Sequence, residues 1–121
     1  MIPEIDKCEL LNIFETILNV NSPSGSEEAI SDKIIDIVKE LQLEIITDAS
    51  IDKIKSNLIL KLPAYNCNNS EPILFSAHMD TVEPTEGIKI IKDSSIYKTD
   101  GSTILGADDK SGIAAILEAL F

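Results

Sequence analysis

Residues 72–82 read PILFSAHMDTV, and this stretch decides the fold class that the sequence predicts. The run that ends at Ala77 is apolar without alternation, which is typical of a strand buried on both faces of a sheet. His78 is the only histidine of the chain, and it follows this run directly, with Asp80 two residues later. Ligands of open α/β sheets bind beyond the carboxyl ends of the strands. The stretch therefore predicts an α/β fold with a polar site where a buried strand ends.

Two amphipathic helices are predicted before this run. The first covers residues 5–20. Ser24, followed by Glu27 three residues later, reads as a capping box that opens the second helix, which extends through Leu41. The apolar residues that define the two faces recur at helical spacing: Leu10, Phe14 and Ile17 in the first helix, and Ile30, Ile34, Ile37 and Leu41 in the second.

Short β-branched and leucine-rich runs predict the remaining strands. Besides 72–77 they cover residues 43–47, 57–62, 88–92 and 96–99. A last helix is predicted from Lys110 onward. At 121 residues the chain is long enough for one domain with a hydrophobic core and short for two.

His78 and Asp80 form the first candidate site. Residues i and i+2 of an extended segment project to the same side, so the two side chains can touch. A carboxylate in that position fixes the tautomer and orientation of an imidazole that binds a metal. A surface turn in which a histidine and an aspartate are neighbours by chance explains the same pattern.

The second candidate site is GADDKSG at residues 106–112, at a loop-to-helix transition. An aspartate is a strong N-cap and favours the positive end of the helix dipole. One cap explains one aspartate, whereas adjacent carboxylates repel each other unless a cation or hydrogen-bond donors compensate them. Asp108 and Asp109 together therefore favour a metal role. Lys110 is expected to pair with these flanking aspartates.

The segments SAHMDTV (76–82) and TDGSTILGADDKSG (99–112), in this order, resemble a known family. It is the peptidase T-like branch of the aminoacylase and glutamate carboxypeptidase family of zinc metallopeptidases. The resemblance also includes SPSGSE at residues 22–27. It implies that residues 1–121 are the N-terminal part of a catalytic domain. That domain has a three-layer α/β/α fold with a mixed, mostly parallel sheet, here truncated and without the lid or dimerisation domain.

The resemblance also implies roles for three side chains. His78 is similar to a terminal metal ligand, Asp80 to the catalytic carboxylate that orients it, and Asp108 to the carboxylate that bridges two zinc ions. The peptide bond between Asp108 and Asp109 is expected to be cis. The implied reaction is two-metal hydrolysis of short peptides, with a zinc-activated water as the nucleophile. A homodimeric parent protein is implied as well.

The general base of the family is not found in this sequence. The family carries it in a later Glu-Glu pair, followed by a further acidic ligand and a second histidine, and Glu118 does not match that pair. Catalytic zinc usually has about three protein ligands. We therefore expect the chain alone to bind metal weakly and to lack peptidase activity.

The charge of the chain excludes some partners. The formal net charge is −11, which opposes binding to nucleic-acid phosphates and to anionic membranes. Acidity also serves solubility, without any metal. Cys8 and Cys67 form no Cys-x-x-Cys pattern and are predicted to be free thiols. With neither a signal peptide nor a transmembrane stretch evident in the sequence, the predicted location is the cytoplasm.

Two other functions compete with the peptidase hypothesis. A haloacid dehalogenase-like phosphatase also has an apolar strand that ends in an aspartate motif, but its nucleophilic aspartate would stand at the position of His78, which cannot form an aspartyl-phosphate. A non-catalytic acidic α/β fragment or binding module is the second alternative. It predicts that replacing His78 or Asp108 by alanine has only ordinary surface effects.

Overall fold

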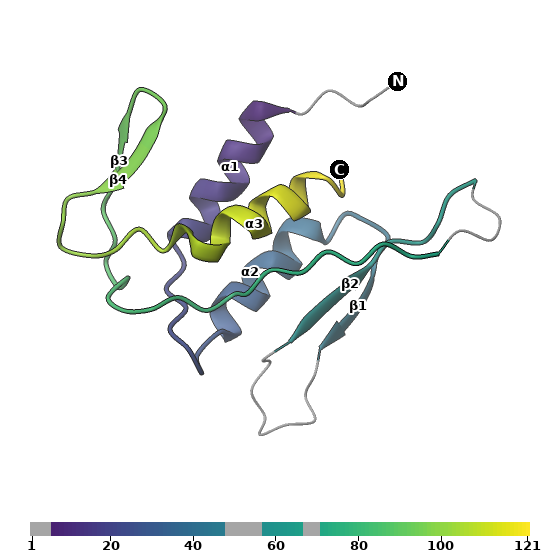
Figure 1. Ribbon diagram of the computed structural model, residues 1–121. Coiled ribbons are helices and arrows are strands. Elements are labelled where there is room, and N and C mark those ends of the chain that lie inside the picture. Colours follow the sequence, from purple (N-terminus) through teal and green to yellow (C-terminus); the bar gives the residue numbers. More distant parts are fainter. Residues whose placement is uncertain (1–5, 48–56, 67–70) are drawn as a thin grey trace.

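The computed structural model describes residues 6–47, 57–66 and 71–121 of the chain. The helices gather in the centre of the molecule, and two β-hairpins lie on opposite sides of them (Figure 1). The described residues thus have the α/β character that the sequence predicts. In chain order the elements are α1 (Lys7–Leu18), α2 (Glu28–Val38), β1 (Glu44–Thr47), β2 (Leu58–Lys61), β3 (Ile90–Asp93), β4 (Ile96–Thr99) and α3 (Ala107–Glu118).

The three helices build the hydrophobic core. Helix α1 packs against both α3 and α2. Each fully buried aliphatic side chain contributes about 1.5–3 kcal/mol relative to an exposed one. The predicted faces of the first two helices are confirmed, since every residue assigned to them belongs to the core or packs against it. The buried core residues are Ile13 and Ile17 of α1, Ile30, Ile34 and Val38 of α2, and Ile113, Ala114 and Leu117 of α3.

Helix α1 begins at Lys7 because Asp6 caps it. Oδ1 of Asp6 accepts hydrogen bonds from the backbone N–H groups of Cys8 (2.9 Å) and Glu9 (3.2 Å), which have no partner within the helix. The predicted start at residue 5 lies outside the described residues. Cys8 is an exposed free thiol, as predicted, while Cys67 lies outside the described residues.

The predicted capping box of the second helix is wrong. The Ser24 hydroxyl donates to the carboxylate of Asp80, and Oε1 of Glu27 accepts from the backbone N–H of Gly25 at 2.7 Å. Gly25 adopts a φ of 85°, and this left-handed turn separates Ser24 from the helix start. Helix α2 therefore begins at Glu28 without a side-chain cap, and it ends at Val38, before the predicted end at Leu41.

The strands form antiparallel hairpins. Strand β1 pairs with β2, and β3 pairs with β4. These four strands confirm the predicted strands at 43–47, 57–62, 88–92 and 96–99 to within two residues. The expected mixed, mostly parallel sheet is not formed by the described residues. Their parallel pairing is limited to one isolated bridge between Pro23 and Thr81.

The predicted buried strand at 72–77 is also wrong for this structure. Residues 72–77 are assigned to no strand. Ile73, Leu74 and Phe75 have 80%, 88% and 68% of their surface exposed. A strand becomes buried on both faces only when it has neighbours in a sheet and layers above and below. The described part of the chain supplies neither for this run.

The β3–β4 hairpin is fixed to helix α1 by Tyr97. The Tyr97 hydroxyl donates to Oε1 of Glu15 at 2.6 Å, and its ring stands edge-on to Phe14 with centroids 5.4 Å apart. Such aromatic pairs contribute about 0.5–1.5 kcal/mol beyond their buried area. This contact anchors the start of the loop that leads from the hairpin to α3. In the described ranges no helix is long and apolar enough to cross a membrane.

Candidate metal and catalytic site

The motif around His78 is held against the N-terminal part of the chain. Ala77 and Met79 pack against the helical core, whereas His78 between them is exposed. The backbone N–H of Thr81 donates to the carbonyl of Ser22 at 2.9 Å, and the Ser22 hydroxyl donates to the carbonyl of Met79 at 2.9 Å. These bonds place the imidazole on the side that faces away from the core.

A close approach at Gly106 brings the second motif next to the first. Gly106 has a φ of 69°, and a Cβ atom there would lie 3.2 Å from Cγ2 of Thr81 and 3.3 Å from Cγ2 of Thr85. Both the backbone conformation and the lack of space favour glycine. The loop can therefore pass directly beside Thr81, and it places Asp108 next to His78.

The two adjacent aspartates have separate partners. Oδ1 of Asp109 accepts from the backbone N–H of Gly112 at 3.1 Å, so Asp109 caps the first turn of the helix. The side chain of Asp108 is 96% exposed, and its Oδ1 lies 3.0 Å from Nε2 of His78. The peptide bond between the two aspartates is cis, as expected. Both residues have non-helical backbone angles, so regular helix begins at Lys110, as predicted.

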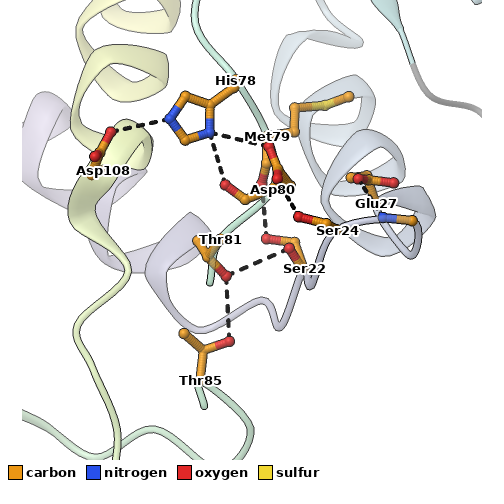
Figure 2. A network of polar contacts seen from close by, with 10 residues as sticks. Ser22, Ser24, Glu27, His78, Met79, Asp80, Thr81, Thr85 and Asp108 are labelled. Atoms are coloured by element: carbon orange, nitrogen blue, oxygen red, sulfur yellow. Dashed lines mark hydrogen bonds and ion pairs between the residues drawn. The ribbon is translucent and has the colours of Figure 1, made fainter. Parts of the chain in front are cut away.

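His78 lies between two carboxylates (Figure 2). Nδ1 is 2.9 Å from the carbonyl oxygen of Asp80 and 3.2 Å from its Oδ1, while Nε2 faces Asp108. The predicted contact of His78 and Asp80 is therefore confirmed. Asp108 first, and the carbonyl of Asp80 second, raise the pKa of His78 above its ordinary 6.5. A positive charge at this imidazole therefore interacts favourably with both Asp80 and Asp108.

The pKa of Asp80 is lowered, mainly because the Ser24 hydroxyl donates to its carboxylate. The imidazole of His78 lowers it further. The carboxylate of Asp80 is therefore an ionised acceptor at neutral pH. Together with the nearer carbonyl oxygen of Asp80, it favours the tautomer of His78 that carries a proton on Nδ1. The other ring nitrogen is then left to face Asp108. This is the arrangement in which an imidazole binds a cation through Nε2.

Lys110 does not pair with the aspartates, contrary to the prediction. Its side chain is fully buried and donates to the backbone carbonyl of Val20, beyond the end of α1. Burial lowers the pKa of Lys110 to about 8. The amine thus satisfies a carbonyl that follows helix α1 and ties this end of α1 to the start of α3.

The pocket at the site is small. His78 and Asp108 line it together with the apolar side chains of Val82 and Ile104. Its volume of about 200 Å³ is below the ~300–1,000 Å³ of typical small-molecule sites. Across residues 6–47, 57–66 and 71–121, no group of three His, Cys, Asp or Glu side chains is arranged to hold a metal ion. Two side chains, His78 and Asp108, converge at this pocket, with Nε2 and Oδ1 3.0 Å apart.

Sequence reasoning missed the part that Ser22 and Ser24 play at the site. Ser24 was assigned to a helix cap and Ser22 was given no role of its own, whereas their hydroxyls bind the carboxylate of Asp80 and the backbone of Met79. The partners are more than fifty residues away in sequence. A local pattern carries no signal for such a contact.

The comparisons with known proteins point to peptidases. No family model matches the chain. The uncharacterized protein YqjE of Bacillus subtilis is 34% identical over 119 residues, which cover 96% of this chain and 32% of the relative. Peptidase T of Streptococcus pyogenes serotype M6 is 35% identical over 104 residues, which cover 60% of this chain and 26% of the relative.

Two solved structures are similar over nearly the whole chain. The aminopeptidase PepT of Bacillus cereus superposes with a TM-score of 0.86 at 35% identity, covering 96% of this chain and 32% of that protein. A tripeptidase of Staphylococcus aureus superposes with a TM-score of 0.80 at 36% identity, covering 98% and 32%. The chain thus spans about a third of the length of these relatives. Over that portion it is similar to peptidase T, as its motifs predict.

Proposed function

We propose that the chain supplies part of a dinuclear zinc site in an exopeptidase that hydrolyses short peptides. The observation that carries the proposal is the convergence of Nε2 of His78 and the exposed carboxylate of Asp108 at 3.0 Å, with Asp80 on the opposite ring nitrogen. The peptidase names of the relatives support the same reaction class. They give no comparable support to a phosphatase of the haloacid dehalogenase type.

The donor set fits zinc in part. Imidazole nitrogen and carboxylate oxygen are common zinc ligands, and catalytic zinc usually has about three protein ligands. On this proposal His78 is a terminal ligand and Asp108 is the carboxylate shared between two ions. Because both ring nitrogens of His78 face oxygen acceptors, Nε2 and Asp108 need a proton or a metal ion between them.

Each residue then has a defined task. Asp80 keeps the proton on Nδ1 of His78, so that the lone pair of Nε2 is directed towards Asp108. Asp109 caps α3 and leaves Asp108 free for the site. Zinc held by His78 and Asp108 would supply Lewis acidity, which lowers the pKa of a bound water to about 7 and polarises a carbonyl. The general base and the remaining ligands come, on this proposal, from polypeptide outside these 121 residues.

The same proposal assigns the apolar run at 72–77 to a buried strand. In the complete protein it is a strand of a mixed, mostly parallel sheet in a three-layer α/β/α fold. Its exposed Ile73, Leu74 and Phe75 support this, because burial would remove three large apolar side chains from water. The relatives support it as well, since about two thirds of their length lies outside the matched portion. We also propose a cytoplasmic, homodimeric parent protein.

Zinc titration and peptide hydrolysis test the proposal on the chain as it stands. We expect weak zinc binding and no turnover of a tripeptide. His78→Ala and Asp108→Ala should each weaken zinc binding by more than about tenfold, the lower limit for loss of an orienting partner. Asp36→Ala, an exposed aspartate on α2 paired with Lys39, is the matched control and should not change the affinity.

Two results would contradict the proposal. Nanomolar zinc affinity or turnover by the chain alone would show that the 121 residues already hold a complete site. Equal zinc affinity in the wild type, His78→Ala and Asp108→Ala would instead support the non-catalytic acidic fragment.

A further inference from the structure

Ser24 is bonded to the outer oxygen of the carboxylate that orients the histidine. Its hydroxyl donates to Oδ2 of Asp80, and the other oxygen of the same carboxylate, Oδ1, faces Nδ1 of His78 at 3.2 Å (Figure 2). The contacts form a chain from Ser24 through Asp80 and His78 to Asp108. The serine lies at the end of this chain that is farthest from the exposed Nε2.

The loop that carries Ser24 is itself fixed. Ser22, fully buried, is bonded through its carbonyl to the N–H of Thr81 and through its hydroxyl to the carbonyl of Met79. On the other side, the N–H of Ser26 donates to the carbonyl of Pro23 at 2.9 Å. Ser24 therefore lies in a turn that hydrogen bonds hold on both sides, rather than in a free loop.

From this geometry we infer that Ser24 is a positioning residue for the site, a step that rests on the proposed function. A carboxylate bonded on one oxygen can rotate about its last torsion, which is broad for aspartate. The hydroxyl on Oδ2 fixes that rotation and holds Oδ1 at the imidazole. Asp80 then keeps the proton on Nδ1, and the lone pair stays on Nε2, where a zinc ion would bind.

Nuclear magnetic resonance of His78 provides a direct test, because the chain has one histidine and its imidazole nitrogens give unambiguous signals. The pH is set above the raised pKa of His78, which titration of the same signals locates. There the ¹⁵N shifts report how the neutral ring divides between its two tautomers. We expect Ser24→Ala to lower the population with the proton on Nδ1. It should also weaken zinc binding, followed by the same signals, by roughly three- to tenfold, less than the ~10–100-fold typical of a direct orienting partner.

Conservative and neighbouring variants separate positioning from folding. Ser24→Thr keeps the hydroxyl and should restore both readouts, whereas Ser26→Ala in the same loop should match the wild type. Asp80→Ala should shift the tautomer further than Ser24→Ala, although the carbonyl of Asp80 still contacts Nδ1. A merely structural role for Ser24 would lower the midpoint of urea unfolding without changing the tautomer.

The inference and the proposed function can fail separately. If Ser24→Ala leaves the tautomer and the zinc affinity unchanged while Asp80→Ala alters them, Ser24 does not position the site and the inference is overturned. The same holds if neither variant alters them. If the tautomer follows Ser24 but His78→Ala and Asp108→Ala leave zinc binding unchanged, the contact chain is real and the metal function is wrong.

Discussion

The helical core and the apolar run at 72–77 have similar side chains in opposite environments. Ile17 and Ile30 are completely buried between helices, whereas Ile73 and Leu74 are 80% and 88% exposed. The helices find their partners within the described residues, because α1 packs against both α2 and α3. The run has no strand beside it in the same ranges.

The difference shows which sequence patterns a short chain can satisfy by itself. An amphipathic helix needs one apolar surface to cover its stripe. A strand that is apolar on both faces needs hydrogen-bonded neighbours and a layer on each side. The candidate site lies between the two regions, since His78 follows the run and Asp108 precedes the regular part of α3, which completes the core.

Truncation of one side chain in each region should have very different effects. We expect Ile17→Ala to lower the free energy of unfolding by about 2–5 kcal/mol, because it leaves a cavity between α1 and its neighbours. Leu74→Ala should change it by less than about 0.5 kcal/mol, as is usual for exposed positions. Urea unfolding followed by circular dichroism measures both. A loss above 2 kcal/mol for Leu74→Ala would mean that the run is buried in solution.

The contact that joins the two regions can be tested with a pair of glycines. Gly106 and Gly87 both have a φ of 69°, but only Gly106 has side chains within 4 Å of an added Cβ. Alanine at either position costs about 1–2 kcal/mol for the left-handed backbone. Gly106→Ala should lower the free energy of unfolding by about 1–3 kcal/mol more than Gly87→Ala, because the added methyl group meets the side chains of Thr81 and Thr85. Equal losses would show that the approach at Gly106 is not tight.

The smallest expected effect is electrostatic and concerns the contact between His78 and Asp108. Asp108→Asn should lower the pKa of His78 towards its ordinary 6.5, since Asp108 is the main cause of its rise. The pair stabilises the fold fully below the unfolded pKa of His78, and this contribution disappears as the pH rises through the folded pKa. Proton resonance of His78 over a pH series measures the shift. An unchanged pKa would mean that the two side chains do not meet in solution.

The sequence predicted the elements better than their assembly. Helical spacing located the stripes of α1 and α2, and the β-branched runs located all four strands, because both signals are local. The predicted capping box was wrong because the Ser24 hydroxyl donates to Asp80 instead of capping the helix, and no local pattern reveals that contact. The pairing of Lys110 with the aspartates was wrong for the same reason, because its partner is the carbonyl of Val20, ninety residues earlier in the chain.

By itself the sequence determined the positions of the helices and of the four strands, the peptidase T-like motifs and the contact between His78 and Asp80, since these depend on residues close together in the chain. The antiparallel pairing of the strands was not among them. The resemblance singled out Asp108 beside His78, and the tertiary structure showed that Asp108 faces the imidazole while Asp109 accepts from the N–H of Gly112. Only the tertiary structure decided that Ser24 holds Asp80 and that Lys110 is buried. The contacts of Asp108, Ser24 and Lys110 each join segments that are distant in sequence, which no local propensity specifies.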